Sequence, residues 1–475
     1  VIHQPKTWTG ALSLRLNGVQ QAHIRFDHAA LELSAAEGKA TLRSAEMIQD
    51  GNEFRFRGNM ELPDTLSGFG RAPARLEISG KAADLARLTS GFGVGLTGTA
   101  EFTGKIDIAG AKLEGNLTVI GRSISFQDGG AETINVTLHA AKALSHEQRA
   151  KPWFADLRTA MQLDLTNVRY GGCLLDSVQG TLTSLDDAFG LDRLEARRNQ
   201  NQITVRGRYR LPAEVGKAAS QPAEVEFALR APETGDFWTP DLPSRVSGVL
   251  EAHGQIKWEN QLADGELSLF GSNLGMRGLV FRQINSQCSI ANSVVYLNDC
   301  SASLNDADSF HATGRLDLRR PFAYGGKIAA NVANLATLQP LLRAFGNPNE
   351  LGGSLTLNWE GEGNTQIARS SGHLKLALQQ GRYGSFRSVQ ANVQATYSPE
   401  GLDAPTIFIA TGKTILQAIV YARNGMLEID KLQLDQGGAS FASGYVSLPF
   451  VWRNLGTKSA IIPLSGKIGA LIQSE

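Results

Sequence analysis

The residues that could do chemistry in this 475-residue chain are few and scattered. The sequence has no Gly-x-Ser-x-Gly elbow, no phosphate-binding Gly-Lys-Ser/Thr loop, no His-Glu-x-x-His and no Cys-x-x-Cys pair. His23 and His28 are the closest histidines, and in a regular strand they have opposite parity and point to opposite faces. We therefore expect a protein that is not an enzyme and that needs no metal and no cofactor.

Two clusters of aspartate have the residue type of a calcium loop but not its spacing. Asp186, Asp187 and Asp192 form the first cluster, and Asp306 with Asp308 forms the second. Neither has the full set of oxygen ligands at alternate positions with a closing Glu. Aspartate is also common in turns, where its carboxylate accepts hydrogen bonds from nearby backbone amides. Turn chemistry explains both clusters better than calcium binding.

Three arginines alternate along one expected strand, at Arg206, Arg208 and Arg210. Such a stripe can bind phosphate groups, for instance those of lipid head groups. A row of this kind is more often the solvent-facing side of an amphipathic strand, with the apolar residues between them on the other side. The sequence favours the second interpretation and leaves the first open.

Two of the three cysteines lie on either side of an expected hairpin turn. Cys288 and Cys300 flank the turn residues near Asn292, which places them near cross-strand opposition and leaves Cys173 unpaired. In an oxidising compartment the pair could form a disulfide. In a reducing compartment the two would be small buried residues.

Alternation of apolar and polar residues with a period of two dominates the chain and predicts strands with one apolar face. Turn clusters rich in Gly, Asn and Asp separate these runs, which indicates antiparallel hairpins in sequence order. The apolar residues that we assign to this face are Leu12, Leu14, Ile106, Ile108, Leu163, Leu165, Leu267, Leu269, Leu355, Leu357, Trp359, Leu374, Leu376, Leu378, Leu432 and Leu434.

A short phrase, Gly-x-x-x-Leu, recurs four times with an apolar residue two positions after the glycine. Its copies begin at Gly58, Gly207, Gly314 and Gly444, and we expect each to be the final strand of a module. Residues 83–88 and 333–343 have the strongest helical signal and precede a glycine-led hairpin, so they are expected to separate modules. The predicted repeat units are residues 1–82, 83–235, 236–335 and 336–475, the first of them partial and the last including the start of another.

The second unit is longer than the others because of an insertion at residues 141–160. This segment carries several charged residues before Trp153. A solvated loop or short helix at the sheet edge is the simpler interpretation. The alternative is an element that docks a partner through Trp153.

Composition narrows the class of protein further. Lys plus Arg and Asp plus Glu each number 46, so the balanced charge gives no indication of nucleic-acid binding. No apolar run is long enough to span a membrane. The first residue is Val1 rather than Met, and the last residues resemble stretches that inside the chain lead into another unit. We expect a piece of a longer protein, whose leader or anchor lies outside this chain.

The apolar face is the remaining candidate for function. The helices are too few to cover so long a sheet, which predicts an all-β repeat sheet curled into an open apolar groove. Exposing a lipid tail to water costs roughly 0.8 kcal/mol per methylene, so a 14-carbon chain costs about 11 kcal/mol. A continuous apolar groove would remove that barrier. In a sandwich or β-helix the same face would simply be core.

Several of these segments resemble the AsmA-like superfamily, which includes TamB-type proteins. The resemblance lies in Ala-Asp/Asn-Leu-Ala-x-Leu at 83–88 and 333–338, the glycine-led hairpins that follow, and residues 424–444. It implies an N-terminal inner-membrane anchor, a long periplasmic β-groove of taco-like section, and a role in carrying phospholipids to the outer membrane or assisting outer-membrane protein assembly. The family has no catalytic residues to carry over.

Together these features predict a periplasmic segment of a bridge-like lipid transfer protein. The expected partners are phospholipids or other acyl-chain lipids, an outer-membrane assembly protein, and the inner membrane through an anchor outside this chain. The alternative is an extracellular or surface β-repeat protein, structural or adhesive, whose apolar face is a closed core.

Overall fold

The computed structural model is one long antiparallel β-sheet, and its residues cluster into two compact units. It describes residues 3–21, 24–90, 95–144, 154, 156–185, 187–213, 215–239, 246–344, 346, 349–364, 370–423, 425–450 and 467–472. Unit 1 holds Val1–Arg230, Asp236–Leu242 and Lys257–Gln261, and unit 2 holds Ala231–Gly235, Pro243–Ile256 and Leu262–Glu475. Strands make up 75% of the structure and helices 8%, which confirms the all-β prediction with few short helices.

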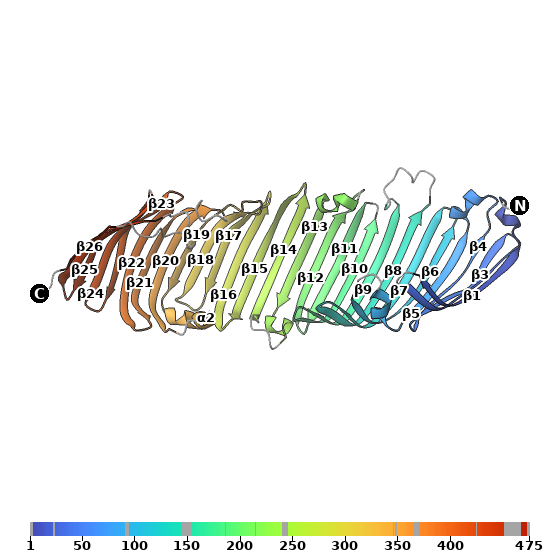
Figure 1. Ribbon diagram of the computed structural model, residues 1–475, viewed down its shortest axis with the longest axis horizontal. Coiled ribbons are helices and arrows are strands. Elements are labelled where there is room, and N and C mark those ends of the chain that lie inside the picture. Colours follow the sequence, from blue (N-terminus) through green and yellow to red (C-terminus); the bar gives the residue numbers. More distant parts are fainter. Residues whose placement is uncertain are drawn as a thin grey trace. The chain divides into compact units, whose positions relative to one another are not determined.

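In unit 1 every strand from β1 to β13 pairs antiparallel with the next strand in the chain, and the sheet is not closed (Figure 1). Its strands are β1 (Gly10–Gln21), β2 (Ile24–Ala36), β3 (Lys39–Gln49), β4 (Asn52–Glu61), β5 (Ala74–Ala82), β6 (Leu96–Ala109), β7 (Lys112–Phe126), β8 (Gly129–Ala143), β9 (Leu157–Tyr170), β10 (Cys173–Leu185), β11 (Ala188–Arg198), β12 (Asn201–Arg210) and β13 (Ala223–Ala231).

In unit 2 the strands from β15 to β27 pair in the same sequential, antiparallel way. The strands in this half of the chain are β14 (Val246–Glu259), β15 (Leu262–Met276), β16 (Leu279–Ala291), β17 (Val294–Ser303), β18 (Ser309–Asp317), β19 (Tyr324–Val332), β20 (Leu351–Gly363), β21 (Ser371–Tyr383), β22 (Phe386–Ser398), β23 (Gly401–Thr411), β24 (Thr414–Arg423), β25 (Met426–Gln436), β26 (Ala439–Pro449) and β27 (Lys467–Ile472).

Short helices interrupt the strands at two kinds of place. Helices α1 (Leu85–Ser90), η5 (Thr234–Phe237), η6 (Leu335–Leu338) and α2 (Gln339–Ala344) each precede a long strand, and α1 and η6–α2 lie where the sequence predicts separators. The 3₁₀ helices η1 (Pro5–Thr7), η2 (Leu66–Arg71) and η4 (Val215–Ser220) begin the chain or follow a Gly-x-x-x-Leu strand. The division into four repeat units stays a prediction.

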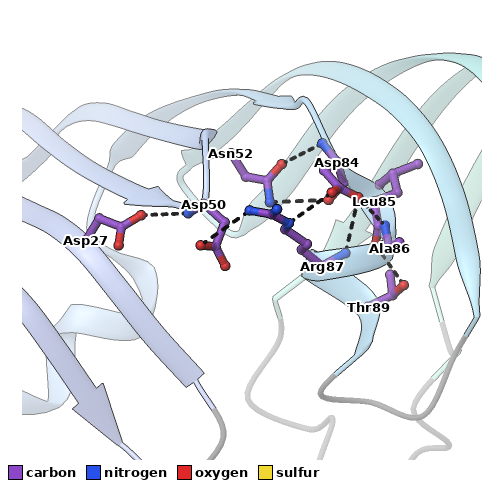
Figure 2. Close-up of polar contacts among 8 residues, drawn as sticks. All are labelled: Asp27, Asp50, Asn52, Asp84, Leu85, Ala86, Arg87 and Thr89. Carbon is purple, nitrogen blue, oxygen red and sulfur yellow. Dashed lines mark hydrogen bonds and ion pairs between the residues drawn. The ribbon is translucent and has the colours of Figure 1, made fainter.

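A buried side chain ties the start of helix α1 to the hairpin turn two strands earlier (Figure 2). Asn52 is fully buried, its Oδ1 accepts from the Asp84 amide at 3.0 Å, and its Nδ2 donates to the Asp84 carbonyl at 3.3 Å. The Asp84 carboxylate then accepts from the amides of Ala86 and Arg87, the donors that a helix N-terminus leaves unpaired. The hydrogen bonds from Asn52 therefore fix the residue at which helix α1 begins.

Unit 2 repeats this arrangement with a carboxylate. Asp308, which is fully buried, accepts from the amides of Ala333 at 2.6 Å and Asn334 at 3.3 Å. Its other oxygen accepts from Asn305 Nδ2 at 2.7 Å and Thr337 Oγ1 at 2.9 Å. Asn334 in turn caps η6 by accepting from the Ala336 amide. Asn52 and Asp308 each stand six residues before the glycine of a Gly-x-x-x-Leu phrase.

The Gly-x-x-x-Leu phrases occupy equivalent strands, β4, β12, β18 and β26. In three copies the leucine amide donates back to the turn that begins the preceding strand, from Leu62 to Gly38, Leu211 to Asp187 and Leu318 to Ser293. The expectation that the phrase forms the last strand of a module is wrong, because β5, β13, β19 and β27 each follow it. The closing strand is short, and in β5, β19 and β27 it carries the stretch by which the end of the chain resembles earlier segments.

Few of the buried apolar side chains lie in the middle of the strands, Ala418 of β24 being an exception. Most are alanines, and the larger ones, such as Leu62, Leu85, Leu274 and Leu335, lie at strand ends or in the short helices. The large side chains in mid-strand are half-exposed. In the described part of the chain, well-packed clusters therefore lie along the rims of the sheet rather than between two layers.

Candidate functional site

The candidate site is the apolar face of the sheet, where strand register aligns the side chains into rows. In unit 1 one such row crosses all thirteen strands, and glycine is its least apolar member. From β1 to β13 it consists of Leu14, Leu31, Ala45, Phe56, Ile78, Gly104, Leu117, Leu138, Met161, Leu182, Leu191, Gly207 and Val225. Because each strand contributes one residue, antiparallel pairing alone makes the row continuous.

Unit 2 has two comparable rows. The first joins Gly271, Ile284, Ala302, Phe310, Ala330, Leu357, Leu376, Val393, Ile407 and Ala418 from β15 to β24. The second joins Val332, Leu355, Leu378, Ala391, Ile409, Leu416, Leu434 and Ala442 from β19 to β26. No charged side chain belongs to either row.

The predicted apolar residues lie on this face and stay accessible. Leu355, Leu357 and Trp359 pair directly with Leu378, Leu376 and Leu374. Leu12 and Leu14, on β1, are 52% and 42% exposed. The other fourteen predicted residues are half-exposed. That they contact lipid stays a prediction.

β-Bulges keep these rows aligned where strict alternation would break them. In β3, β11, β17 and β25 the strand gains one residue opposite the Gly-x-x-x-Leu strand, for example between Leu191 and Leu194, which pair with Gly207 and Val205. Each bulge returns an apolar residue to the apolar face after the extra position. The sequence-based alternation missed such residues in β3, β11 and β17 because it assumed one constant parity per strand, although it included Leu432 of β25.

The opposite face of the sheet is polar, and many of its charges are paired. Arg206 and Arg208 lie opposite Glu226 and Glu224 in the register, and Arg210 Nε is 2.9 Å from an Asp187 carboxylate oxygen. All three arginines are exposed. This arrangement favours the solvent-face interpretation of the arginine stripe.

A hollow of about 660 Å³ on the polar face of unit 2 is lined mainly by glycines and uncharged polar residues, and its four charged side chains already pair with one another. Lys327 Nζ is 2.9 Å from Glu360, and an Arg315 guanidinium nitrogen is 3.8 Å from Glu362. His373 Nδ1 lies 2.9 Å from the Thr396 hydroxyl. With its carboxylates and cations engaged, the hollow has the composition of a solvated strand surface.

Glu195 is the one nearly buried carboxylate on the polar face of unit 1 among the described residues. Burial alone would raise the pKa of this carboxyl, but hydrogen bonds and charge from Arg197 and Arg193 outweigh it and hold the pKa below its usual value. The group therefore stays ionised near neutral pH and acts as an ion-pair centre rather than as an acid or base.

Cys288 and Cys300, the pair for which the sequence leaves a disulfide open, are free cysteines offset from one another. Register places Cys288 opposite Leu297 and Cys300 opposite Ser286, so the thiols are diagonal neighbours on the apolar face. The turn is the tight pair Asn292–Ser293, both with positive φ as a type I′ turn requires, and a bulge follows. A cross-strand disulfide would need the two strands to shift register.

Sequence reasoning also missed a polar pair on the apolar face. Trp359 Nε1 donates to the Tyr397 hydroxyl at 2.9 Å, from β20 across β21 to β22. The available signal was the glycine at Gly372, which leaves room between the two rings on the strand between them. His23, Asp186 and Trp153 lie outside the described residues.

The described residues contain neither a metal-binding cluster nor a membrane-spanning helix. No three His, Cys, Asp or Glu side chains there come together in a way that would hold a metal ion. No helix in the described segments is both long and apolar enough to cross a membrane.

Comparison with known proteins adds no neighbour. No family model, no curated protein and no solved structure matches the chain. The function must therefore be argued from the two faces of the sheet.

Proposed function

We propose that this chain is a segment of a bridge-like lipid transfer protein that shields acyl chains on its apolar face while the polar face meets water. As the resemblance implies, we place it in the AsmA-like superfamily and in the periplasm, between the inner and outer membranes, where it would serve outer-membrane biogenesis. It acts passively and without a catalytic step.

The observation that carries the proposal is the unbroken apolar row. In unit 1 such a row crosses β1 to β13, and its large mid-strand side chains are half-exposed rather than covered by a second layer. A row of similar Leu, Ile, Val and Phe side chains gives an acyl chain similar contacts at each strand. A lipid can then move along the face without meeting a deep energy minimum.

Differences in exposure between the two faces support a groove. Over residues 96–104 of β6 and 157–166 of β9 the apolar-face residues are less exposed than the polar-face residues that alternate with them. Side chains crowd together on the inner side of a curved sheet and spread apart on its outer side. We therefore propose that the apolar face is the concave one and forms the open, taco-like groove.

A paired charge substitution in unit 2 tests the proposal. Leu357 and Leu376 are direct partners on the apolar face, and Leu357→Asp with Leu376→Asp would place two charges in the path of an acyl chain. The purified wild-type chain is expected to carry co-purified phospholipid in native mass spectrometry. The double variant should fold, judged by circular dichroism, and lose most of that lipid.

Asn358→Asp with Lys375→Asp is the matched control, because these two exposed residues pair on the opposite face of the same strands. This variant should retain lipid. A wild-type chain without lipid would contradict the proposal. Wholesale unfolding of the apolar-face variant, with the control intact, would instead support a structural β-repeat protein with a closed core.

A further inference from the structure

The Trp359–Tyr397 pair is one of two polar pairs that interrupt the apolar face of unit 2 near one rim, the other being Tyr324 with Ser370. Both residues share the face of their row neighbours, since Trp359 pairs with Leu374 and Tyr397 pairs with Gly372. The hydrogen bond between them spans two strand spacings. It therefore requires that β21, the strand between them, offers no side chain at that position.

Glycines on two adjacent strands make that space. A Cβ added at Gly372 would lie 2.7 Å from the Tyr397 hydroxyl, and one added at Gly361 would lie 2.7 Å from the Trp359 ring. Gly361 and Gly372 are themselves register partners. Both aromatic rings thus occupy space that a side chain at Gly361 or Gly372 would otherwise fill.

The Tyr397 hydroxyl has a proton that no described residue accepts. The indole of Trp359 donates to the phenol oxygen and so occupies one of its lone pairs. Among the described residues the phenol makes no second hydrogen bond, and Tyr397 is half-exposed. A phenol held by one partner beside two glycines is a directed hydrogen-bond donor.

We propose that the Tyr397 hydroxyl donates a hydrogen bond to an acyl ester carbonyl of a glycerolipid held on this face. The inference rests on the proposed function and specifies which group of the lipid the Tyr397 hydroxyl binds. An ester carbonyl lies where the apolar chain meets the head group, so it suits a single neutral donor beside apolar rows. A phosphate would need cations, and the nearby Lys327 and Lys375 lie on the polar face.

Ester- and ether-linked phospholipids separate this donor from general apolar binding. Diacyl and dialkyl phosphatidylcholine of equal chain length differ in the carbonyl that the donor needs. In competition, native mass spectrometry of the wild-type chain should show the diacyl lipid loaded about two- to tenfold more, the range of one net hydrogen bond. Tyr397→Phe keeps the ring and should reduce that ratio to about one.

Tyr296→Phe is the matched control, because it removes an exposed phenol from the polar face of the same unit and should leave the ratio unchanged. Equal loading by the wild-type chain, or a preference that survives in Tyr397→Phe, would overturn the inference while leaving lipid binding intact. Failure of both lipids to bind would instead overturn the proposed function, and this inference with it.

Discussion

No part of Asp308 is exposed, yet the residue carries a charge, because four donors from three segments converge on its two oxygens. Burial alone would raise the pKa of this carboxyl. The hydrogen bonds from Asn305, Thr337, Ala333 and Asn334 outweigh burial and hold the pKa below its usual value. The corresponding residue of unit 1 is the neutral Asn52. We therefore expect acid to weaken the hydrogen bonds of Asp308 but not those of Asn52.

Stability should depend on the Asp308 charge in a defined direction. Since its folded-state pKa is lowered, the carboxylate contributes stability that is complete above its unfolded pKa of about 3.9 and is lost as pH falls through the folded value. Asp308→Asn should cost about 1–3 kcal/mol near neutral pH, because two donors lose their acceptor. That cost should shrink between pH 5 and pH 3 in urea titrations.

Asp306→Asn is the control, since the Asp306 side chain is 91% exposed and pairs only with Arg282 among the described residues. It should change stability by a few tenths of a kcal/mol at most. If the difference between Asp308→Asn and the wild type were constant across this pH range, the charge would not contribute as argued.

At single residues, the sequence predicted partners poorly and positions well. Alternation placed Leu357 and Leu376 on one face, as the register has them. It did not predict the diagonal offset of Cys288 and Cys300, because a one-residue bulge and a tight turn move strand register without leaving a clear sequence pattern. Tyr397 was missed for a related reason, since its partner Trp359 is two strands away and only the glycine between them joins the two.

The long strands β6, β14 and β20 share one backbone feature near their first residues, a glycine with positive φ. Gly98, Gly248 and Gly353 all have positive φ, and a Cβ at any of them would lie within 2.6 Å of a carbonyl oxygen on the neighbouring strand. The facing strands carry Ser123, Asn273 and Gln380, themselves with positive φ. These paired irregularities bend the sheet near its rim.

Gly98→Ala should therefore be strongly destabilising. The added Cβ would meet the Ser123 carbonyl at 2.6 Å, and alanine disfavours the φ of +112° found there. We expect a loss of about 2 kcal/mol or more in thermal or denaturant unfolding. Gly70→Ala, where a Cβ meets nothing within 4 Å, should be nearly neutral or slightly stabilising. Equal effects at the two positions would argue against the bulge as a strained, specified feature.

Elements were predictable where their signal is local. Hairpin turns and the separators at 83–88 and 333–343 rest on Gly, Asn and helix-capping residues that are neighbours in sequence. Strands such as β5 and β19 were not assigned as closing strands because the Gly-x-x-x-Leu phrase before them has the stronger repeat signal, although their sequences resemble the end of the chain. The proposed curl of the face is the hardest feature to predict, since a curl depends on bulges summed over many strands.

The whole molecule consists of strands that contact mainly their sequence neighbours. Stability in such an array is close to a sum of local terms, and a local defect spreads only a few strands. We therefore expect a defect in one compact unit to leave the other unit unaffected. The chain has 46 charged residues of each sign, so its net charge does not explain the boundary between the two units.

Asp308→Ala should accordingly loosen unit 2 alone. Hydrogen exchange measured by mass spectrometry is expected to accelerate in β18, β19 and the η6–α2 segment, because their shared acceptor is gone. Peptides from β1 to β12 of unit 1 should exchange at wild-type rates. A uniform acceleration across both units would mean that the chain unfolds as one cooperative body.

Helices α1 and η5 are separated by eight strands, β6 to β13, and η5 and η6 by six, β14 to β19. Both numbers are even, and in an antiparallel meander an even number of strands returns the chain to the rim from which it left. Gaining or losing one hairpin would preserve this relation, while a single added strand would move every later helix to the opposite rim. Insertions and deletions during evolution should therefore change such a chain by whole hairpins, which lengthens its apolar rows by two strands at a time.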